Sequence, residues 1–385
     1  MDLEGLAPGA VAVVFGTRPE IIKVAGIVRL LGDRALTMYS GQHFDAKLSQ
    51  VFFDDLGLPP CDVLLDVGGR SRAAQIGELV VKLDAEFERR RPAAVVVQGD
   101  TNTTVGGALA ANARGILLAH VEAGLRSFDR RMPEEHNRVV ADHLSDLCLA
   151  ATPASRANLL AEGVPASRIA VTGNTVVDAA TSILPPPAER RRLLGAFDVA
   201  PAQFVLATFH RPENVDDPGR LATIISELEG LGLPVLFPVH PRTRARMDAS
   251  GYGAGGAGAG GGVRLAEPIG YRTFLGLAAE SALLVSDSGG VQEEASVVKR
   301  PVVVVRRSTE RPEVMGTFAV LVPDPAAIGR AARRWLGQLE KAHRELAGLA
   351  SPYGDGRASE RCVDHLSRAL AARPRPGDGA GRGPG

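Results

Sequence analysis

Short runs of apolar residues alternate along this chain with longer segments whose apolar residues recur at helical spacing. In the first half, the runs predict strands at Val11–Val14, Ala35–Tyr39, Ala93–Val97 and Ile116–Val121. Most positions in each run are apolar, which is typical of parallel strands buried on both faces. Strand, polar loop and helix in repeated succession predict a parallel sheet covered by helices on both sides.

A second series of apolar runs begins beyond a proline cluster in the middle of the chain. It predicts strands at Phe204–Thr208, Val235–Pro238, Ala282–Ser286 and Val302–Val305. The prolines at 185–187 favour a domain junction just before them, because proline interrupts regular structure. We therefore expect an α/β protein with two Rossmann-like, doubly wound domains facing a central cleft.

The length of 385 residues exceeds one ordinary hydrophobic core and agrees with two domains. We expect an N-terminal domain over residues 1–177 and a C-terminal domain over residues 178–357. Two further segments have too little apolar content to pack. Residues 251–262 are almost all Gly and Ala and predict a surface loop, and residues 373–385 predict a disordered tail.

Charge and cysteine content exclude several classes of function. The 44 basic and 44 acidic residues cancel, which argues against a nucleic-acid or membrane partner. Cys61, Cys148 and Cys362 are far apart and lack metal-ligand spacing, so we expect reduced thiols in a cytoplasmic protein. The N-terminal stretch does not resemble a secretory signal, and no apolar run approaches the ~20 residues of a membrane-spanning helix.

The first candidate site is the segment Phe15–Glu20, which follows the first predicted strand. Pro19 suits the first turn of a helix, and the N–H groups of a helix N-terminus attract anions. Arg18 adds a guanidinium fork that fits phosphate. The segment therefore predicts a phosphate site. It lacks two glycines of the Gly-x-Gly-x-x-Gly turn, which argues against an NAD oxidoreductase.

Polar blocks follow the other predicted strands as well. They are Gly41–His43, Gln98–Thr101, His120–Arg126, Pro133–Arg138, Phe209–Asn214, Ser286–Glu294 and Thr309–Glu313. An isolated Asp after a strand is often only a helix cap, so the argument rests on the whole set. We expect the carboxylates of Asp100, Glu122 and Glu134 to converge, raise one another's pKa and perform acid/base chemistry. Glu135 and Glu293 are interpreted as solvated neighbours of functional residues.

The second half of the chain supplies a candidate anion clamp. The segment Ser288–Gly290 precedes a predicted helix, and its N–H groups and hydroxyl suit a diphosphate. Arg18, Arg311 and His210 would complete this clamp with charge-assisted hydrogen bonds. Carboxylates at one end of a site and a diphosphate clamp at the other suit a sugar nucleotide.

These blocks, in this order from Phe15 to about Leu370, resemble the non-hydrolysing UDP-N-acetylglucosamine 2-epimerase family. The resemblance implies the GT-B arrangement, with a last helix at about 358–372 that packs back on the first domain, and a cytoplasmic homodimer. It implies reversible conversion of UDP-GlcNAc to UDP-ManNAc for cell-surface polysaccharide synthesis, without NAD or metal. In the family reaction the C2 proton is removed while UDP leaves C1, and UDP then adds back to the 2-acetamidoglucal.

The resemblance also assigns roles to individual residues of this chain. The acid/base group comprises Asp100, Glu122 and Glu134, with Arg138 and His210 holding the sugar or pyrophosphate. The substrate-binding group comprises Arg18, Lys23, Phe274, Ser288, Gly289, Gly290, Glu294 and Arg311. Within it, Phe274 would stack on uracil, Glu294 would accept the ribose hydroxyls, and Lys23 would lie near the phosphates.

The chain departs from the common bacterial pattern at two blocks, of which Phe209–Asn214 differs from the His-Arg-Arg-Glu version. Gln42 and His43 are followed by Phe44 and Asp45, so the second Gln of the regulatory-site motif is missing, although His240 remains. Three other functions stay open. They are 2-epimerisation of a UDP-2,3-diacetamido-uronic sugar, a hydrolysing 2-epimerase that releases ManNAc and UDP, and a GT-B glycosyltransferase. The carboxylate set disfavours the transferase, which needs an acceptor pocket there, and also a non-catalytic sugar-nucleotide sensor.

Overall fold

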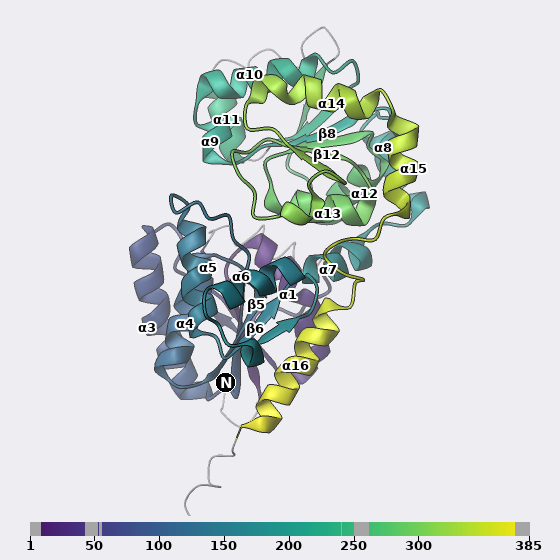
Figure 1. The fold of residues 1–385 in the computed structure, drawn as a ribbon. Helices are drawn as coiled ribbons and strands as arrows, with labels where there is room; N and C mark the ends of the chain where they lie inside the picture. Colours follow the sequence, from purple (N-terminus) through teal and green to yellow (C-terminus); the bar gives the residue numbers. More distant parts are fainter. Residues whose placement is uncertain (1–8, 43–52, 54–55, 240, 250–261, 374–385) are drawn as a thin grey trace, which may run out of the picture. The chain divides into compact units, whose positions relative to one another are not determined.

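The computed structural model describes residues 9–42, 53, 56–239, 241–249 and 262–373, and the chain divides into two compact units (Figure 1). Unit 1 comprises Met1–Ala179 and Gly354–Gly385, and unit 2 comprises Ala180–Tyr353. The segments expected as a loop and a tail lie outside the described residues except for Gly262 and Arg373. His43 and His240 lie outside them too.

Unit 1 contains a seven-stranded parallel sheet of order β3-β2-β1-β4-β5-β6-β7. Its strands are β1 (Val11–Phe15), β2 (Ala35–Tyr39), β3 (Val63–Leu64), β4 (Ala94–Gln98), β5 (Leu117–Ala123), β6 (Leu147–Ala150) and β7 (Ile169–Val171). The four strands predicted in this half are confirmed to within two residues. All five residues of β1 and of β4 are buried, as expected for central strands covered on both faces.

Helices cover both faces of this sheet (Figure 1). They are α1 (Arg18–Leu31), α3 (Arg72–Arg90), α4 (Asn102–Ala113), α5 (Pro133–Leu144), α6 (Pro153–Ala161) and α16 (Ala358–Ala372), with 3-10 turns η2 (Gly32–Arg34) and η3 (Ala166–Arg168). Helix α7 (Thr175–Ile183) runs across the division between the two units. Residues of α3, α4 and α5 share one hydrophobic core with alternate residues of the central strands. The C-terminal helix α16 packs against α1, where Gly26 leaves room for Ser359.

Unit 2 contains a six-stranded parallel sheet of order β10-β9-β8-β11-β12-β13. Its strands are β8 (Val205–Thr208), β9 (Val235–Pro238), β10 (Val263–Ala266), β11 (Leu283–Ser286), β12 (Val302–Val304) and β13 (Ala319–Leu321). The four strands predicted here are confirmed to within one residue.

The helices of unit 2 again form two layers (Figure 1). They are α8 (Pro187–Ala196), α9 (Pro212–Val215), α10 (Pro218–Glu229), α11 (Pro241–Ala249), α12 (Tyr271–Glu280), α13 (Gly289–Val298), α14 (Ile328–Leu336) and α15 (Leu339–Gly348), with 3-10 turns η4 (Pro312–Val314) and η5 (Pro325–Ala327). Residues of α10 and α14 pack on one face of the sheet in a common core. Helices α12 and α13 pack together and lie across the sheet from α10 and α14.

The two sheets have the same strand order, so the predicted pair of doubly wound α/β domains is confirmed. Chain direction across each sheet reverses between β1 and β4 in unit 1, and between β8 and β11 in unit 2. Open sheets of this kind bind ligands at the carboxyl ends of the strands beside this reversal. Within the described ranges, no helix combines the length and apolar composition needed to cross a bilayer.

Candidate active site

The turn between β1 and α1 is built around Gly16. A Cβ on Gly16 would come within 2.0 Å of the Ser40 hydroxyl and 2.1 Å of the Thr103 hydroxyl, so only glycine fits there. Arg18 begins α1, and Pro19 lies in its first turn as predicted. The Gly16 N–H, however, donates to Oε2 of Glu20 at 3.1 Å. A carboxylate of the chain itself therefore occupies part of the turn that was predicted to bind phosphate.

Sequence reasoning did not single out Glu20, which is buried between the turns that follow β1 and β4. Its Oε1 accepts a hydrogen bond of 2.9 Å from the Thr101 hydroxyl. Burial raises the pKa of Glu20 to about 7, although hydrogen bonds from Thr17, Thr101 and the Gly16 N–H act in the opposite direction. Glu20 is thus a titratable group that joins the two turns of the unit 1 reversal.

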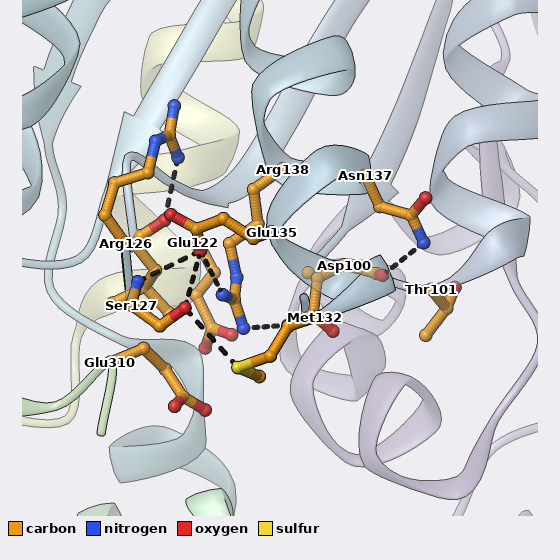
Figure 2. A network of polar contacts seen from close by, with 12 residues as sticks. Asp100, Thr101, Glu122, Arg126, Ser127, Met132, Glu135, Asn137, Arg138 and Glu310 are labelled. Atoms are coloured by element: carbon orange, nitrogen blue, oxygen red, sulfur yellow. Dashed lines mark hydrogen bonds and ion pairs between the residues drawn. The ribbon is translucent and has the colours of Figure 1, made fainter. Parts of the chain in front are cut away.

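Asp100 follows β4 and is ion-paired with Arg138 of α5 (Figure 2). The same guanidinium binds Oε2 of Glu135 at 2.8 Å. Asn137, the residue before Arg138, donates to the Asp100 carbonyl oxygen at 2.7 Å. Helix α5 therefore fixes both the side chain and the backbone of Asp100, while Glu134 lies half-buried in its first turn.

The interpretation of Glu135 as a solvated side chain is wrong. Glu135 is buried and accepts the N–H groups of Ser127 at 3.0 Å and Phe128 at 2.9 Å. Burial raises the pKa of Glu135, but these two bonds and the Arg138 charge outweigh it and hold that pKa below its ordinary value. Glu135 thus stays ionised and fixes the loop before α5 together with Arg138.

Glu122 lies at an irregular point of β5. The register between β5 and β6 shifts between Val121 and Ala123, and Glu122 has a φ of 69°. Such a bulge re-aims one side chain, and a left-handed conformation in a residue other than Gly costs roughly 1–3 kcal/mol. The buried Glu122 carboxylate is ion-paired with Lys23 of α1 and accepts a 2.7 Å bond from the Asn174 amide.

These contacts revise the expectation that the predicted carboxylates act on one another. Asp100 is held by Arg138 and Glu122 by Lys23, so two of the three predicted carboxylates have a cationic partner. An adjacent cation favours the ionised carboxylate, which is the form that can accept a proton. Lys23, expected near phosphate, is a direct partner of the Glu122 carboxylate.

In unit 2, His210 follows β8 and Asp287 follows β11. The Asp287 carboxylate is buried and accepts the N–H groups of His210 at 3.2 Å and Arg211 at 3.0 Å, and the Asn214 amide at 3.0 Å. Burial raises the pKa of Asp287, but the His210 and Asn214 bonds outweigh it and lower that pKa. The His210 ring lies 3.2 Å from Asp287 and is 44% exposed, so it is held yet reachable by a ligand.

The N-terminus of α13 lies beside the Arg311 guanidinium. Ser288 is the N-cap residue, and a Cβ on Gly289 would come within 2.7 Å of Nη1 of Arg311. Arg311 is ion-paired with Glu293 at 2.8 Å and with Glu310. The interpretation of Glu293 as solvated is therefore wrong, since this side chain is fully buried. A helix N-terminus and an arginine at one point favour an anion.

The two remaining predicted ligand residues of unit 2 lie on adjacent helices. Phe274 is half-buried in the first turn of α12, and Glu294 is buried in α13. Burial and the neighbouring Glu294 carboxylate raise the pKa of Tyr271 well above its ordinary value. Tyr271 therefore links the start of α12 to Glu294.

The predicted site residues lie in both units, in the loops and helices that follow the parallel strands, and printed contacts join Lys23 to Glu122 and Asp100 to Arg138 in unit 1 and bring Gly289 next to Arg311 in unit 2. Unit 1 contributes Arg18, Lys23, Asp100, Glu122, Glu134 and Arg138. Unit 2 contributes His210, Phe274, Ser288, Gly289, Gly290, Glu294 and Arg311. Among the residues that the structure describes, no group of three His, Cys, Asp or Glu side chains is placed to hold a metal ion.

Comparison with known proteins gives consistent matches over most of the chain. The family model of UDP-N-acetylglucosamine 2-epimerase matches residues 34–367. The UDP-N-acetylglucosamine 2-epimerase of Methanocaldococcus jannaschii is 36% identical over 92% of this chain and 98% of its own. The UDP-2,3-diacetamido-2,3-dideoxy-D-glucuronate 2-epimerase of Pseudomonas aeruginosa is 34% identical over 92% of this chain and 98% of its own. A crystal structure of the M. jannaschii enzyme with UDP-GlcNAc and UDP superposes with a TM-score of 0.81, at 35% identity, over 93% of this chain and 99% of that one.

Proposed function

Because the chain belongs to the UDP-N-acetylglucosamine 2-epimerase family, we propose that it interconverts UDP-GlcNAc and UDP-ManNAc without releasing the sugar. The observation that carries this proposal is the pair of carboxylates Asp100 and Glu122. They lie at or just beyond the ends of neighbouring strands, and each is ion-paired with a cation from another element. Two carboxylates near the carboxyl ends of adjacent strands suit proton transfer at a carbon.

The proposed reaction begins with loss of the C2 proton to a carboxylate. The electrons of the C2–H bond form the C1=C2 double bond, and those of the C1–O bond leave with UDP. The products of this step are 2-acetamidoglucal and UDP. In the second step a UDP oxygen attacks C1, and C2 accepts a proton on its opposite face. Asp100, Glu122 and Glu134 are the proposed proton donors and acceptors, with Arg138 setting the position of Asp100.

Unit 2 has the proposed task of holding UDP throughout. The N–H groups of Ser288–Gly290 and the guanidinium of Arg311 suit the diphosphate, and the exposed ring of His210 suits a pyrophosphate or sugar oxygen. Phe274 is proposed to stack on uracil, and Glu294 to accept the ribose hydroxyls. Tight retention matters because UDP is both the leaving group of the first step and the nucleophile of the second.

A second candidate substrate is a UDP-2,3-diacetamido-uronic sugar. The P. aeruginosa relative that is named for such a substrate is almost as similar in sequence as the M. jannaschii relative. Both substrates undergo the same inversion at C2, so the acid/base residues would be shared.

Product analysis by NMR tests this proposal. The purified protein is incubated separately with UDP-GlcNAc and with the diacetamido-glucuronate nucleotide, and the anomeric protons and the phosphorus signals are followed. We expect one of the two substrates to be converted to a stable mixture of two UDP-sugars, with free UDP far below the amount of product. Stoichiometric UDP and free ManNAc would identify a hydrolysing epimerase instead. No change in either substrate would contradict the proposal.

A further inference from the structure

Asp142 is a buried carboxylate of α5 to which neither the sequence motifs nor the proposed reaction gives a role. Its side chain is fully buried and lies on the same helix as Glu135 and Arg138. The three residues are spaced at i, i+3 and i+7, so they share the inner face of the helix. Glu135 fixes the loop before α5, and Arg138 fixes Asp100. Asp142 is the third buried charge on this face, and its contacts lie elsewhere.

The Asp142 carboxylate binds β5 on both sides of the Glu122 bulge. Oδ1 lies 2.7 Å from Nδ1 of His120, two residues before Glu122. Oδ2 accepts the N–H of Gly124, two residues after Glu122, at 3.1 Å. Arg126 adds a third contact of 2.7 Å. One carboxylate thus anchors both flanks of the residue with the left-handed backbone.

The backbone at Gly124 can exist only with glycine. Gly124 has a φ of 81°, and a Cβ there would come within 2.3 Å of the Ser155 carbonyl oxygen. Its carbonyl oxygen accepts a 3.0 Å bond from the Asn158 amide. The end of the bulge is therefore fixed from α6 as well, and Asp142 supplies the acceptor that its N–H needs.

His120 extends the reach of Asp142 to the other predicted acid. Its Nε2 lies 2.8 Å from the carbonyl oxygen of Gly99, the residue before Asp100. Gly99 in turn donates its N–H to Val121 at 3.0 Å. The turn that carries Asp100 and the bulge that carries Glu122 are thus joined through one imidazole, and that imidazole is held by Asp142.

We propose that Asp142 is a positioning residue, which acts through His120 and Gly124 to set the geometry of both Glu122 and Asp100. The charge of Asp142 supports this role: burial raises its pKa, but His120 and Arg126 outweigh that effect and keep the carboxylate ionised. The inference rests on the proposed function, because it assumes that Glu122 and Asp100 transfer protons. A displacement of about 1 Å in such groups is enough to cost about 100-fold in rate.

The test is the variant Asp142→Asn, which keeps the shape of the side chain but turns an amide NH2 toward groups that donate. We expect kcat per UDP-binding molecule to fall about 10- to 100-fold, while KM and UDP affinity change less than about twofold. Asp178→Asn is the matched control. Like Asp142, Asp178 is a carboxylate of unit 1 that accepts backbone N–H groups, but these belong to Ala358 and Ser359, so the kcat of Asp178→Asn should stay unchanged.

A double-mutant cycle with Glu122→Gln separates positioning from general damage. If Asp142 acts in part through Glu122, Asp142→Asn should cost less in the Glu122→Gln background than in the wild type, because only the loss that acts through Asp100 remains there. If the losses of kcat in the two single variants simply added up in the double variant, the positioning role of Asp142 would be overturned. The same would follow if Asp142→Asn kept wild-type turnover while Glu122→Gln was impaired, and in both cases the acid/base role of Glu122 would stand. Wild-type turnover in Glu122→Gln would overturn the acid/base role of Glu122, and the positioning role with it.

A second variant covers the case in which Asp142→Asn does not fold. His120→Asn keeps a nitrogen near the place of Nδ1 for the bond to Asp142 and loses the bond to the Gly99 carbonyl oxygen. We expect its kcat to fall about tenfold or more with KM nearly unchanged. Unchanged kcat in a folded His120→Asn protein would overturn the link to Asp100.

Discussion

Arg138 of α5 is ion-paired with Asp100, the carboxylate that follows β4. The two residues are 38 positions apart in the chain and meet because α5 packs against α4, whose first residues continue the Asp100 turn. Arg138 is nearly fully buried, and its second carboxylate partner is Glu135. The pair thus holds the Asp100 side chain beside the strand reversal at which the sheet topology predicts a ligand.

Asp100→Asn should abolish most turnover and leave UDP binding intact. Asparagine keeps the shape of the side chain but cannot take up a proton, and general acid/base groups supply about 10²- to 10⁴-fold in rate. Kinetics with calorimetric UDP titration measure both quantities. Asp62→Asn is the control, because Asp62 accepts the Thr37 N–H at 2.8 Å in the same unit and has no proposed role. If Asp100→Asn kept turnover near that of the wild type, Asp100 would have no acid/base role in the reaction.

Gly289→Ala should weaken UDP binding by displacing Arg311. The added Cβ would lie 2.7 Å from Nη1, and a guanidinium at the end of a flexible side chain can move aside without unfolding the protein. Loss of one charge-assisted hydrogen bond costs ~1.5–3 kcal/mol, or roughly 10- to 150-fold in affinity. Gly219→Ala is the control in the first turn of α10, where the nearest atom is 3.4 Å away. Equal UDP affinity in both variants would count against an anion site beside Arg311.

The central strands could be predicted from sequence because their residues are apolar on both faces. β2 and β9 even begin and end at the predicted residues. The β6 strand, Leu147–Ala150, escaped prediction because a run of four apolar residues does not distinguish a strand from a buried helical turn. The three-residue edge strand β13 is only partly buried and has a still weaker pattern.

The motifs select the segments that carry the candidate site residues, but they do not show which carboxylate turns inward. Glu134 and Glu135 are adjacent, and consecutive helical positions point about 100° apart, so the pattern alone does not identify Glu135 as the buried one. The partners of Glu122 lie too far along the chain for any spacing rule. Lys23 is 99 residues away and Asn174 is 52 residues away, and only the folded sheet brings them together.

Glu20→Gln should remove a pH dependence of folding stability. The pKa of Glu20 rises from 4.5 to about 7 on folding, so its stabilising contribution is full below about pH 4.5 and is lost as the pH rises through 7. A shift of this size corresponds to about 3 kcal/mol of unfolding free energy. Urea unfolding of both proteins at pH 5 and pH 8 measures it. Glu88→Gln, at a carboxylate that is 72% exposed, should behave like the wild type. If the unfolding free energy of Glu20→Gln fell between pH 5 and pH 8 as much as that of the wild type, the raised pKa of Glu20 would be contradicted.

Gly26→Ala should loosen the packing of α16 on α1. The new Cβ would meet Oγ of Ser359 at 2.3 Å and its Cβ at 2.9 Å, and overpacking of this kind costs typically 1–3 kcal/mol. A Cβ added at Gly77 of α3 would meet no atom within 4 Å, so Gly77→Ala should instead stabilise the protein by roughly 0.5–1 kcal/mol. Thermal unfolding followed by circular dichroism compares the two. A melting temperature that Gly26→Ala leaves unchanged would contradict the close contact between these helices.

Removal and return of the C2 proton of a UDP-sugar can be followed by proton NMR in deuterated water. With UDP-GlcNAc as substrate, we expect deuterium to enter C2 of both epimers as UDP-ManNAc forms. Asp100→Asn and Glu122→Gln, compared at equal UDP occupancy, should slow exchange and epimerisation together. Epimerisation that leaves the original hydrogen on C2, or consumption of UDP-GlcNAc without any C2 exchange, would rule out proton removal at C2.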